Sequence, residues 1–472
     1  MMSSSDLNEE SEKQTAITSS GNGNSDKSAV PNVKQWFDSG GADAIYKPNL
    51  SSIEGNGNPI LARGAFGEIS IAIRAEKNRW HLVAVKTILQ STNAATAASN
   101  PWSSNLTSFN NNNKPKLAHE VFHEICALRL LNPHPNIVEL LAVYPADCNR
   151  GQQQPIQQQM DLMSGKSVSL AFSYCPTDLY LTLEWRRRSL MPPLPFEAIK
   201  TVARDIFSAI HHCHSHGVLH LDIKPGNFLV SSKGFIQLCD FGLAKPFSKD
   251  AKQRQEEESR GMCTLYYRPP ELLLGGTADD PAVDNYSAGL VLAELLNGLP
   301  LFQGGNALGQ LAAIFGVLGT PNQTNWPRVS ELPDYGKLNY APKTKKPFEL
   351  LLPRATESPF LLDLFQQLIV LDPQRRLSAE RVLCHRWLDA LPKPASREIL
   401  QEELIPSHIR EMILLSNPNM DLTVASKQAI DQAKTRRGFL SSLHQWRGNQ
   451  QAKASSGTAL HDRCSQLCPA LY

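Results

Sequence analysis

Alternating hydrophobic and polar positions predict β-strands in the first part of the chain. Period-two alternation that is rich in β-branched residues is typical of a strand with one buried face. The runs that show it are 68–73, 81–86, 137–144 and 169–174. Between the second and third runs, residues 117–131 repeat apolar side chains at helical spacing, which predicts a helix that ends before Pro133. A small antiparallel sheet with one helix is therefore expected here.

Helical spacing dominates from residue 196 onward. The predicted helices, separated by Gly and Pro, are 197–214, 285–297, 308–318 and 359–371. A mainly β first part and a mainly α second part predict an α+β fold with two lobes. The smaller, β-rich lobe is expected at about 57–174 and the larger, α-helical lobe at about 175–391. The candidate site is expected in the cleft between the lobes.

Polar, low-complexity segments flank and interrupt this pattern. Residues 1–45 are rich in Ser, Asn, Gly, Glu and Lys, and we expect disorder because this composition buries too little apolar surface. Residues 90–116 and 150–166 contain Asn and Gln runs and are expected to be solvated loop insertions rather than binding elements. A competing hypothesis, which the sequence cannot test, makes these segments the functional part and the folded domain their anchor.

The chain length bounds the domain organisation. With 472 residues the chain could hold two or three domains, but two cooperating lobes with disordered additions fit equally well. We place a folded domain at 46–391. The polar tail at 392–472 is expected to be partly helical or disordered, with one candidate helix at 424–434.

Composition argues against several classes of function. The 47 Lys and Arg residues oppose 45 Asp and Glu, so the formal net charge of +2 creates no field that would attract nucleic acid or a membrane surface. Nine cysteines without paired spacing argue against a disulfide framework or a zinc site. The N-terminus lacks the apolar core of a signal peptide, and no apolar run is long enough to cross a bilayer. We expect an intracellular protein of the nucleus, the cytoplasm or both.

The densest group of reactive side chains lies at 219–227, which reads Leu-His-Leu-Asp-Ile-Lys-Pro-Gly-Asn. The apolar lead-in predicts a short strand, and the Pro-Gly pair forces a turn, so Asp222, Lys224 and Asn227 should project from a fixed loop. A carboxylate can accept a hydroxyl proton, an ammonium can neutralise a moving phosphoryl group, and an amide oxygen can hold a divalent cation. The loop therefore suits phosphoryl transfer.

An ordered set of motifs resembles the eukaryotic protein kinase family over about residues 61–391. Each motif alone is weak evidence, and their order carries the resemblance. The set is Gly64-Ala65-Phe66-Gly67, Val83-Ala84-Val85-Lys86, Glu124, His220-Leu221-Asp222 through Asn227, Asp240-Phe241-Gly242, Pro269-Pro270-Glu271, Asp284 and Arg376. The resemblance implies the two-lobed kinase fold, ATP and Mg²⁺ as cofactors, and protein substrates.

The resemblance also implies roles for the polar loop. Asp222 would orient the substrate hydroxyl and accept its proton. Lys224 matches the position that is typical of Ser/Thr-specific kinases. Asn227 and Asp240 would hold Mg²⁺ between the ATP phosphates.

A nucleotide site is implied in the β-rich part. Lys86 would contact the phosphates and be held by Glu124, with Glu120 as the fallback partner. Gly64 and Gly67 would let the backbone approach the phosphates. The remaining positions would surround the adenine: Leu61, Ile69, Ala84, Phe172, Tyr174, Cys175 and Leu229.

Later segments resemble the cyclin-dependent kinases. The matching stretches are Thr264 to Gly275, Leu301-Phe302, Leu318 to Pro321, Trp326-Pro327 and Leu371 to Leu377. The resemblance implies a Ser/Thr kinase in cell-cycle or transcription control, a buried ion pair between Glu271 and Arg376, and a cyclin as a candidate partner whose need stays open. A rival interpretation is a pseudokinase scaffold that binds a cyclin-like partner without catalysis.

Two positions, Ser259 and Thr264, are candidate regulatory residues. Ser259 aligns with the family's activating phosphorylation site. The three basic residues that clamp this phosphate in the family align here with His123, Leu221 and Lys245, so one permanent cation remains. Because an ordered phosphate depends on charge-assisted pairing, we expect activity that does not require Ser259 phosphorylation.

Other departures narrow the comparison further. Ala62 replaces the first glycine of the Gly-rich loop, and Ala65 and Phe66 lack the hydroxyls that carry inhibitory phosphates in cyclin-dependent kinases. These departures resemble divergent CDK-activating kinases. Arg268 and the family resemblance together imply a preference for substrates with proline after the phosphorylated residue.

Overall fold

The computed structural model describes only part of the chain. The described residues are 45–46, 60–64, 67–76, 79–88, 119–145, 168–247, 263–337, 340–407, 409–410, Asp431 and Thr435. All of them belong to one compact unit, Ser39–Tyr472. The predictions for residues 1–44, for both insertions and for Ser259 fall outside the described residues, as does the predicted helix at 424–434 apart from Asp431.

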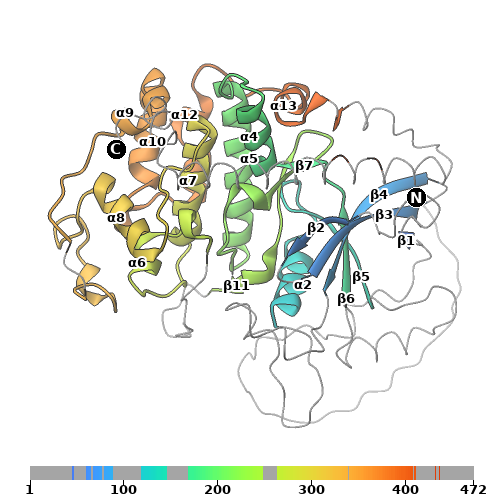
Figure 1. Ribbon diagram of the computed structural model, residues 1–472, viewed down its shortest axis with the longest axis horizontal. Coiled ribbons are helices and arrows are strands. Elements are labelled where there is room, and N and C mark those ends of the chain that lie inside the picture. Colours follow the sequence, from blue (N-terminus) through green and yellow to red (C-terminus); the bar gives the residue numbers. More distant parts are fainter. Residues whose placement is uncertain are drawn as a thin grey trace, which may run out of the picture. The chain divides into compact units, whose positions relative to one another are not determined.

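A six-stranded antiparallel sheet forms the first lobe (Figure 1). The strand path is β1-β3-β4-β6-β5, and β2 pairs with β3. The strands are β1 Ile45–Tyr46, β2 Ile60–Gly64, β3 Gly67–Glu76, β4 Arg79–Ile88, β5 Leu140–Pro145 and β6 Val168–Ser173. Successive side chains point to opposite faces of a strand, and the apolar positions of β3, β4 and β6 accordingly meet in one buried cluster of Ala72, Val83, Val85 and Ala171.

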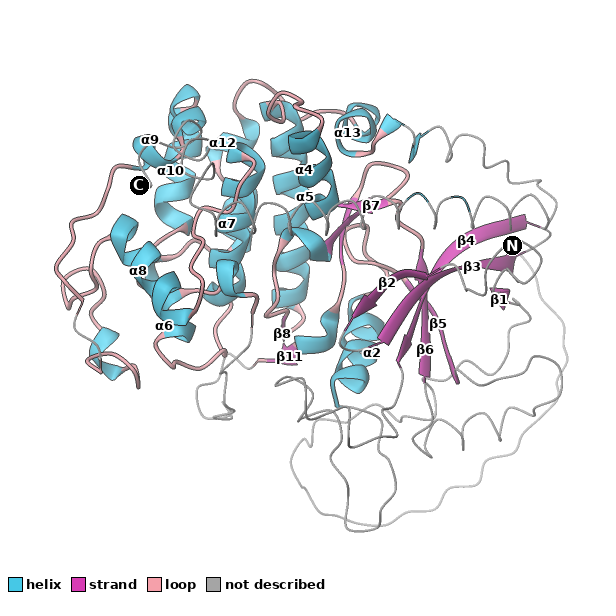
Figure 2. Ribbon diagram, viewed as in Figure 1, coloured by secondary structure: helices cyan, strands magenta, loops and turns pink. Residues whose placement is uncertain are grey.

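One helix of this lobe, α2 at His119–Leu131, lies beside the sheet (Figure 2). It begins two residues later than the predicted helix and ends at the predicted residue. Its apolar positions Val121, Ile125, Leu128 and Leu131 are buried. The helix also contacts the turn at Phe241–Leu243, which follows Asp240 in the second lobe.

Helices build the second lobe (Figure 2). They are α4 Leu179–Arg188, α5 Phe196–Ser215, α6 Pro270–Leu273, α7 Ala282–Asn297, α8 Ala307–Leu318, α9 Phe348–Leu351, α10 Pro359–Leu368, α11 Ala379–Leu383, α12 Arg386–Asp389 and α13 Arg397–Leu404. Helix α7 is buried on every side from Ala282 to Leu296, so it forms the centre of this lobe. It ends at Gly298, which adopts the left-handed conformation that favours glycine at a helix end.

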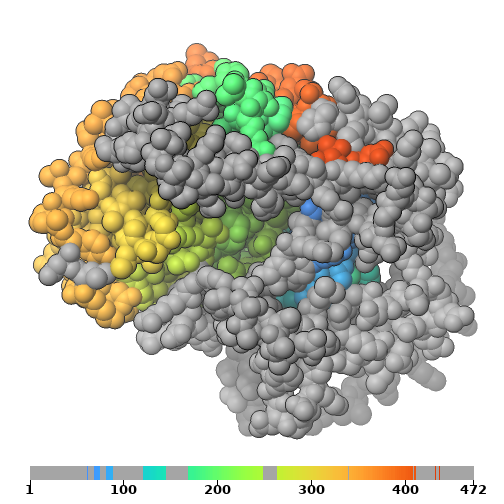
Figure 3. Space-filling view, in the orientation of Figure 1, coloured from blue at the N-terminus to red at the C-terminus, as the bar shows by residue number. Residues whose placement is uncertain are grey.

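Short strands carry the polar loop. β8 Val218–Leu219 pairs with β11 Lys245–Pro246. β9 Phe228–Val230 pairs with β10 Ile236–Leu238 and with β7 Thr177–Asp178. In the space-filling view, green residues from this part of the chain lie between the yellow helices of the second lobe and the blue strands of the first (Figure 3).

The predicted α+β class with a β-rich and an α-helical lobe is confirmed. The predicted helices correspond to α2, α5, α7, α8 and α10, with ends that differ by a few residues. Helix α4 is absent from the predicted set because its charged C-terminal half obscures the apolar spacing. Among the described residues, no helix is both long and apolar enough to span a membrane.

Candidate active site

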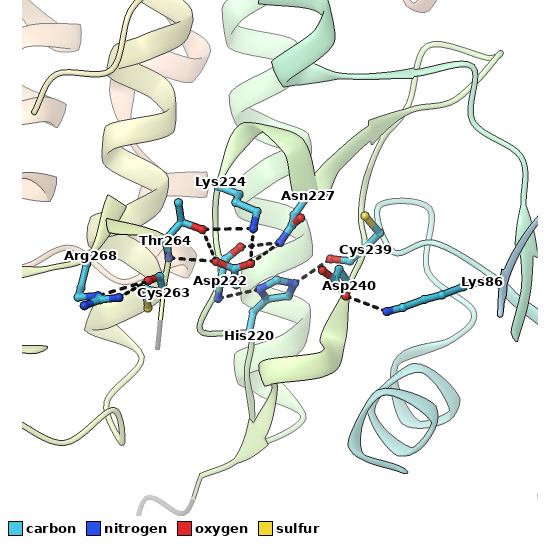
Figure 4. Close-up of polar contacts among 10 residues, drawn as sticks. All are labelled: Lys86, His220, Asp222, Lys224, Asn227, Cys239, Asp240, Cys263, Thr264 and Arg268. Carbon is cyan, nitrogen blue, oxygen red and sulfur yellow. Dashed lines mark hydrogen bonds and ion pairs between the residues drawn. The ribbon is translucent and has the colours of Figure 1, made fainter. Parts of the chain in front are cut away.

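The polar loop folds around the carboxylate of Asp222 (Figure 4). Its Oδ2 accepts hydrogen bonds from Lys224 Nζ at 2.6 Å and from Asn227 Nδ2 at 3.1 Å. Its Oδ1 accepts from the Thr264 hydroxyl at 2.8 Å and from the Thr264 backbone N–H at 3.1 Å. Both oxygens are therefore fixed from two sides, and Asp222 is only 7% exposed.

The buried carboxylate of Asp284 fixes the backbone of the loop. Asp284, at the start of α7, accepts the N–H groups of His220 and Leu221 at 2.9 Å each. His214 contacts the same carboxylate at 2.9 Å. Burial opposes ionisation of Asp284, but the hydrogen bond and charge of His214 outweigh it, so the pKa of this carboxyl lies below its ordinary value.

His220 connects the loop to the segment that precedes Asp240. Its Nδ1 accepts the N–H of Asp222 at 3.2 Å, and its Nε2 lies 3.0 Å from the carbonyl oxygen of Cys239. Since Nδ1 acts as an acceptor, Nε2 carries the proton and donates to that carbonyl. One imidazole thus sets the relative position of Asp222 and Asp240.

A charged group joins the two lobes. Lys86 on β4 lies 2.9 and 2.8 Å from the two carboxylate oxygens of Glu124 on α2, and 3.0 Å from Asp240 Oδ1. Burial opposes the charge of Lys86, but the two carboxylates outweigh it and raise the pKa of the ammonium above its ordinary value. Of the two helix carboxylates that the sequence left open, the structure places Glu124 against Lys86.

The donor set for a divalent cation consists of Asn227 and Asp240. Asn227 uses its amide nitrogen on Asp222, which leaves its amide oxygen as an acceptor. Asp240 keeps a partly exposed carboxylate, 40% by side chain, with one oxygen bound to Lys86. An amide oxygen and a carboxylate are the hard ligands that Mg²⁺ takes alongside phosphate oxygens and water, so the residues fit this ion.

The predicted nucleotide-binding residues lie on the strands around Lys86. Gly64 and Gly67 face each other across the β2–β3 turn, and Leu61 and Ile69 pack in one cluster with Tyr174. Ala84 on β4 pairs with Phe172 on β6. The side chain of Cys175 is buried and donates to Gln237 Oε1 at 3.3 Å, and Leu229 lies on β9.

Leu221 points away from this polar group into an apolar cluster. Its side chain is fully buried with Leu219, Cys263, Leu272, Ala278 and Val283, and Leu243 and Phe247 pack against the same cluster. Leu243 and Phe247 precede residues 248–262, and Cys263 follows them, so the cluster joins both ends of this segment. We call it the apolar anchor.

Leu221 adopts an unusual backbone conformation in the anchor. Its φ of 64° lies in the left-handed region, which costs a non-glycine residue roughly 1–2 kcal/mol. The hydrogen bonds from the N–H groups of His220 and of Leu221 itself to Asp284 help to hold this conformation. The other two positions of the family's phosphate clamp, His123 and Lys245, lie on α2 and β11.

Thr264, a candidate regulatory residue, lies next to the polar loop. Its hydroxyl donates to Asp222 Oδ1 and lies 3.2 Å from Lys224 Nζ. A phosphate there would introduce negative charge directly beside the Asp222 carboxylate. Position relative to the Pro-Pro-Glu motif is the only signal that could have placed Thr264 in the site, because the contact spans 42 residues.

The comparisons with known proteins agree with this geometry. The protein kinase domain family matches residues 57–388. Cyclin-dependent kinase 20 of Homo sapiens is 34% identical over 277 residues, which cover 59% of this chain and 72% of that protein. Cyclin-dependent kinase C-1 of Oryza sativa subsp. japonica is 36% identical over 276 residues, 57% of this chain and 50% of that protein.

A solved structure shows the same fold. A chain in the CAK complex from Chaetomium thermophilum bound to ATP-γ-S superposes with a TM-score of 0.57 and 28% identity, covering 75% of this chain and 94% of that chain. The motif resemblance and the two-lobed fold are thereby confirmed. The chain belongs to the protein kinase family, in the cyclin-dependent branch of the serine/threonine kinases.

Proposed function

We propose that this protein transfers the γ-phosphate of ATP to serine or threonine hydroxyls of protein substrates, with a role in cell-cycle or transcription control. The observation that carries the proposal is the joint placement of Asp222, Lys224, Asn227 and Thr264 in one hydrogen-bonded group, linked through His220 to Asp240. A scaffold without catalysis would not need four polar side chains in one hydrogen-bonded group and a fifth, Asp240, held next to it through His220 and the Cys239 carbonyl.

The chemistry follows from charges that are held in place. The Asp222 carboxylate orients the attacking hydroxyl and accepts its proton, while Lys224 lies next to it to offset the charge of the transferred group. Lys86, held by Glu124, positions the nucleotide phosphates. Asn227 and Asp240 would hold Mg²⁺, which supplies charge neutralisation between the phosphates. Catalysis of this kind consists mostly of positioning and electrostatic stabilisation.

Radioactive phosphate transfer from ATP to a generic basic protein, with Mg²⁺, tests the proposal. The wild-type chain should transfer phosphate, and the same preparation with Asp222→Asn should bind nucleotide equally well but transfer far less. Nucleotide binding by the wild-type chain without any transfer, with and without added cyclins, would favour the pseudokinase scaffold.

We further propose that substrates carry proline directly after the phosphorylated residue. Cys263, next to Thr264, has a φ of 63°, and its carbonyl oxygen is taken by Arg268 at 2.7 Å from Nη2 and 3.3 Å from Nε. This carbonyl cannot then accept a backbone N–H from a substrate. A buried N–H without a partner costs about 1–3 kcal/mol, whereas proline has no N–H to leave unpaired.

Three otherwise identical peptides separate this idea from a shape preference. They carry proline, alanine or N-methylalanine after the serine. Both residues without an N–H should support a kcat/KM about tenfold above that of alanine or more. If N-methylalanine behaved like alanine, the ring of proline would be recognised instead, and the proposed reason would be wrong.

The partners follow from the relatives. The relatives are cyclin-dependent kinases, which favours a cyclin as the candidate partner, and protein substrates follow from the proposed activity. We propose an intracellular location, in the nucleus, the cytoplasm or both. Kinase assays of the purified chain with and without a panel of cyclins, on a peptide library, test the partner, and imaging of a fluorescent fusion tests the location.

A further inference from the structure

The residues beyond the kinase domain match contribute a helix to the second lobe. The match ends at residue 388, and α13 spans Arg397–Leu404. Leu400 and Leu404 on this helix are fully buried, and the Leu404 carbonyl accepts the hydroxyl of Thr182 on α4 at 2.7 Å. In Figure 1, α13 lies beside the ends of α4 and α5. This part of the predicted polar tail is therefore packed onto the catalytic domain.

Arg397, the first residue of α13, contacts both helix α5 and the turn between β9 and β10. Its guanidinium binds both oxygens of Asp205 on α5, with distances of 2.5 Å from Nη1 to Oδ2 and 2.8 Å from Nη2 to Oδ1. Nη1 also donates to the carbonyl of Gly234 at 3.1 Å, and the guanidinium lies 4.0 Å from the ring centroid of Phe235. The Asp205 carboxylate in turn accepts the N–H of Ile236 at 3.0 Å.

Apart from the pairing of Arg397 with Asp205 on α5, these contacts fall on one β-hairpin. Gly234 and Phe235 form the turn between β9 and β10, and Ile236 begins β10. Gly234 has a φ of 77°, and a Cβ atom there would lie 2.6 Å from the Arg397 carbonyl oxygen, so the turn rests directly on α13. The fork of Arg397 and the buried Asp205 thus hold the turn from two sides.

The other end of the same hairpin carries both candidate Mg²⁺ ligands. Asn227 immediately precedes β9, and Asp240 follows β10 by two residues. The N–H of Cys239 donates to the carbonyl of Asn227 at 2.9 Å, which closes the base of the hairpin. Its strands are three residues each, so the turn lies only about 10 Å from the base.

We propose that Arg397 is a positioning residue for the metal site. Acting through Asp205 and the β9–β10 turn, it holds Asn227 and Asp240 at the separation that a Mg²⁺–nucleotide complex needs. The chain after the kinase match is then part of the catalytic apparatus rather than an appendage. The inference concerns the same site as the proposed function, and it requires Mg²⁺-dependent nucleotide binding but no phosphoryl transfer.

The test is a Mg²⁺ titration of nucleotide binding by the full chain, followed with a fluorescent ATP analogue. Arg397→Ala should raise the Mg²⁺ concentration for half-maximal binding about three- to tenfold, with little change in nucleotide binding measured without Mg²⁺. Arg397→Lys keeps the charge but loses the forked guanidinium. Its Mg²⁺ concentration for half-maximal binding should lie between those of wild type and Arg397→Ala. Gly234→Ala, which disturbs the turn from the hairpin side, should produce the same shift and serves if Arg397→Ala does not fold.

Glu403→Gln is the matched control. Glu403 lies on the same helix, and its carboxylate pairs with Arg186 on α4 at 2.8 Å. The Glu403→Gln variant should have a lower melting temperature, and the Mg²⁺ dependence of its nucleotide binding should be that of wild type. The proposal is overturned if the Arg397 variants and Glu403→Gln lose stability alike while the Mg²⁺ dependence of each stays within twofold of wild type. A wild-type chain that binds Mg²⁺–nucleotide but never transfers phosphate would refute the proposed function and leave this inference standing.

Discussion

Two neighbouring residues of the polar loop, Leu221 and Asp222, are held by opposite kinds of contact. Asp222 lies in a group of polar partners, Lys224, Asn227 and Thr264, that fix both of its oxygens. Leu221, one residue earlier, has its side chain in the apolar anchor and has no charged atom to offer a phosphate. The charged groups that phosphoryl transfer would use lie together around Asp222, whereas the described residues on either side of residues 248–262 are joined by apolar packing.

The two solutions differ in how they respond to conditions. Ion pairs are weakened by salt and depend on the protonation or phosphorylation of their members. The strength of apolar contacts depends on the area removed from water, so it does not change with protonation or phosphorylation. Because the apolar anchor joins Leu243 and Phe247 to Cys263, we propose that activity does not depend on a phosphate at Ser259.

The largest effect is expected on the polar side of the comparison. Asp222→Asn keeps the shape of the side chain and the contact with Lys224 but removes the proton acceptor. A positioned general base contributes about 10²–10⁴-fold, so kcat should fall by that factor. Steady-state kinetics measures the fall, and titration with a nucleotide analogue should show unchanged binding. Turnover close to wild type would contradict the assignment of Asp222.

The apolar side should respond first in stability. Leu221→Ala leaves a cavity in a fully buried cluster, and comparable truncations cost about 2–5 kcal/mol of unfolding free energy. Leu221→Met nearly conserves the volume and should cost less than about 1.5 kcal/mol. Urea denaturation of both variants measures this. Equal losses for Ala and Met would mean that side-chain packing at Leu221 is not what holds the segment.

A basic residue at position 221, as the family has in its phosphate clamp, tests the apolar anchor further. Leu221→Arg would place a guanidinium among Leu219, Cys263 and Val283, where it has no acidic partner within the apolar anchor. Burial of a charge without a partner is strongly unfavourable, so this variant should be less stable than Leu221→Ala. A melting temperature above that of Leu221→Ala would show that the cluster opens readily to solvent.

A smaller effect is expected at a polar contact of Tyr267, which follows Thr264 by three residues. The Tyr267 hydroxyl donates to Glu294 at 2.6 Å, and burial raises the pKa of Glu294 to about 7. The folded carboxyl keeps its proton up to this pH, whereas the unfolded one releases it near 4.5. The folded state therefore binds more protons in this window, and stability falls as pH rises through it.

Glu294→Gln removes this pH dependence. Its unfolding free energy relative to wild type should rise between pH 5 and pH 8, by about 3 kcal/mol at most. Urea denaturation at several pH values measures the difference, with the exposed Glu349→Gln as control. A difference that stays constant with pH would rule out titration of Glu294 in this range.

Much of the fold could be predicted from the sequence because its signals are local. Period-two alternation identified β3 and β4, and helical spacing identified α5 and α7. The Pro-Gly pair correctly indicated the turn that follows Lys224. The ordered motifs then selected the residues that the structure brings together around Asp222 and Lys86.

The remaining features depend on contacts that sequence spacing does not encode. Arg397 and Asp205 lie 192 residues apart, and neither stands out among the charged residues of its own segment. Thr264 is a candidate regulatory residue by its sequence position, and its contact with Asp222, 42 residues away, appears only in the folded protein. The left-handed backbone at Cys263 and the capture of its carbonyl by Arg268 likewise appear only in three dimensions.

The central claim is that the charged groups for catalysis are kept, while the residues on either side of 248–262 are held together by apolar packing instead of by a phosphate. The most direct test compares the kcat/KM of wild type, phosphatase-treated wild type and Ser259→Ala on one peptide at saturating Mg²⁺–ATP. The account predicts that the three values agree within about twofold. A loss of tenfold or more in both the treated protein and the folded Ser259→Ala variant would contradict it.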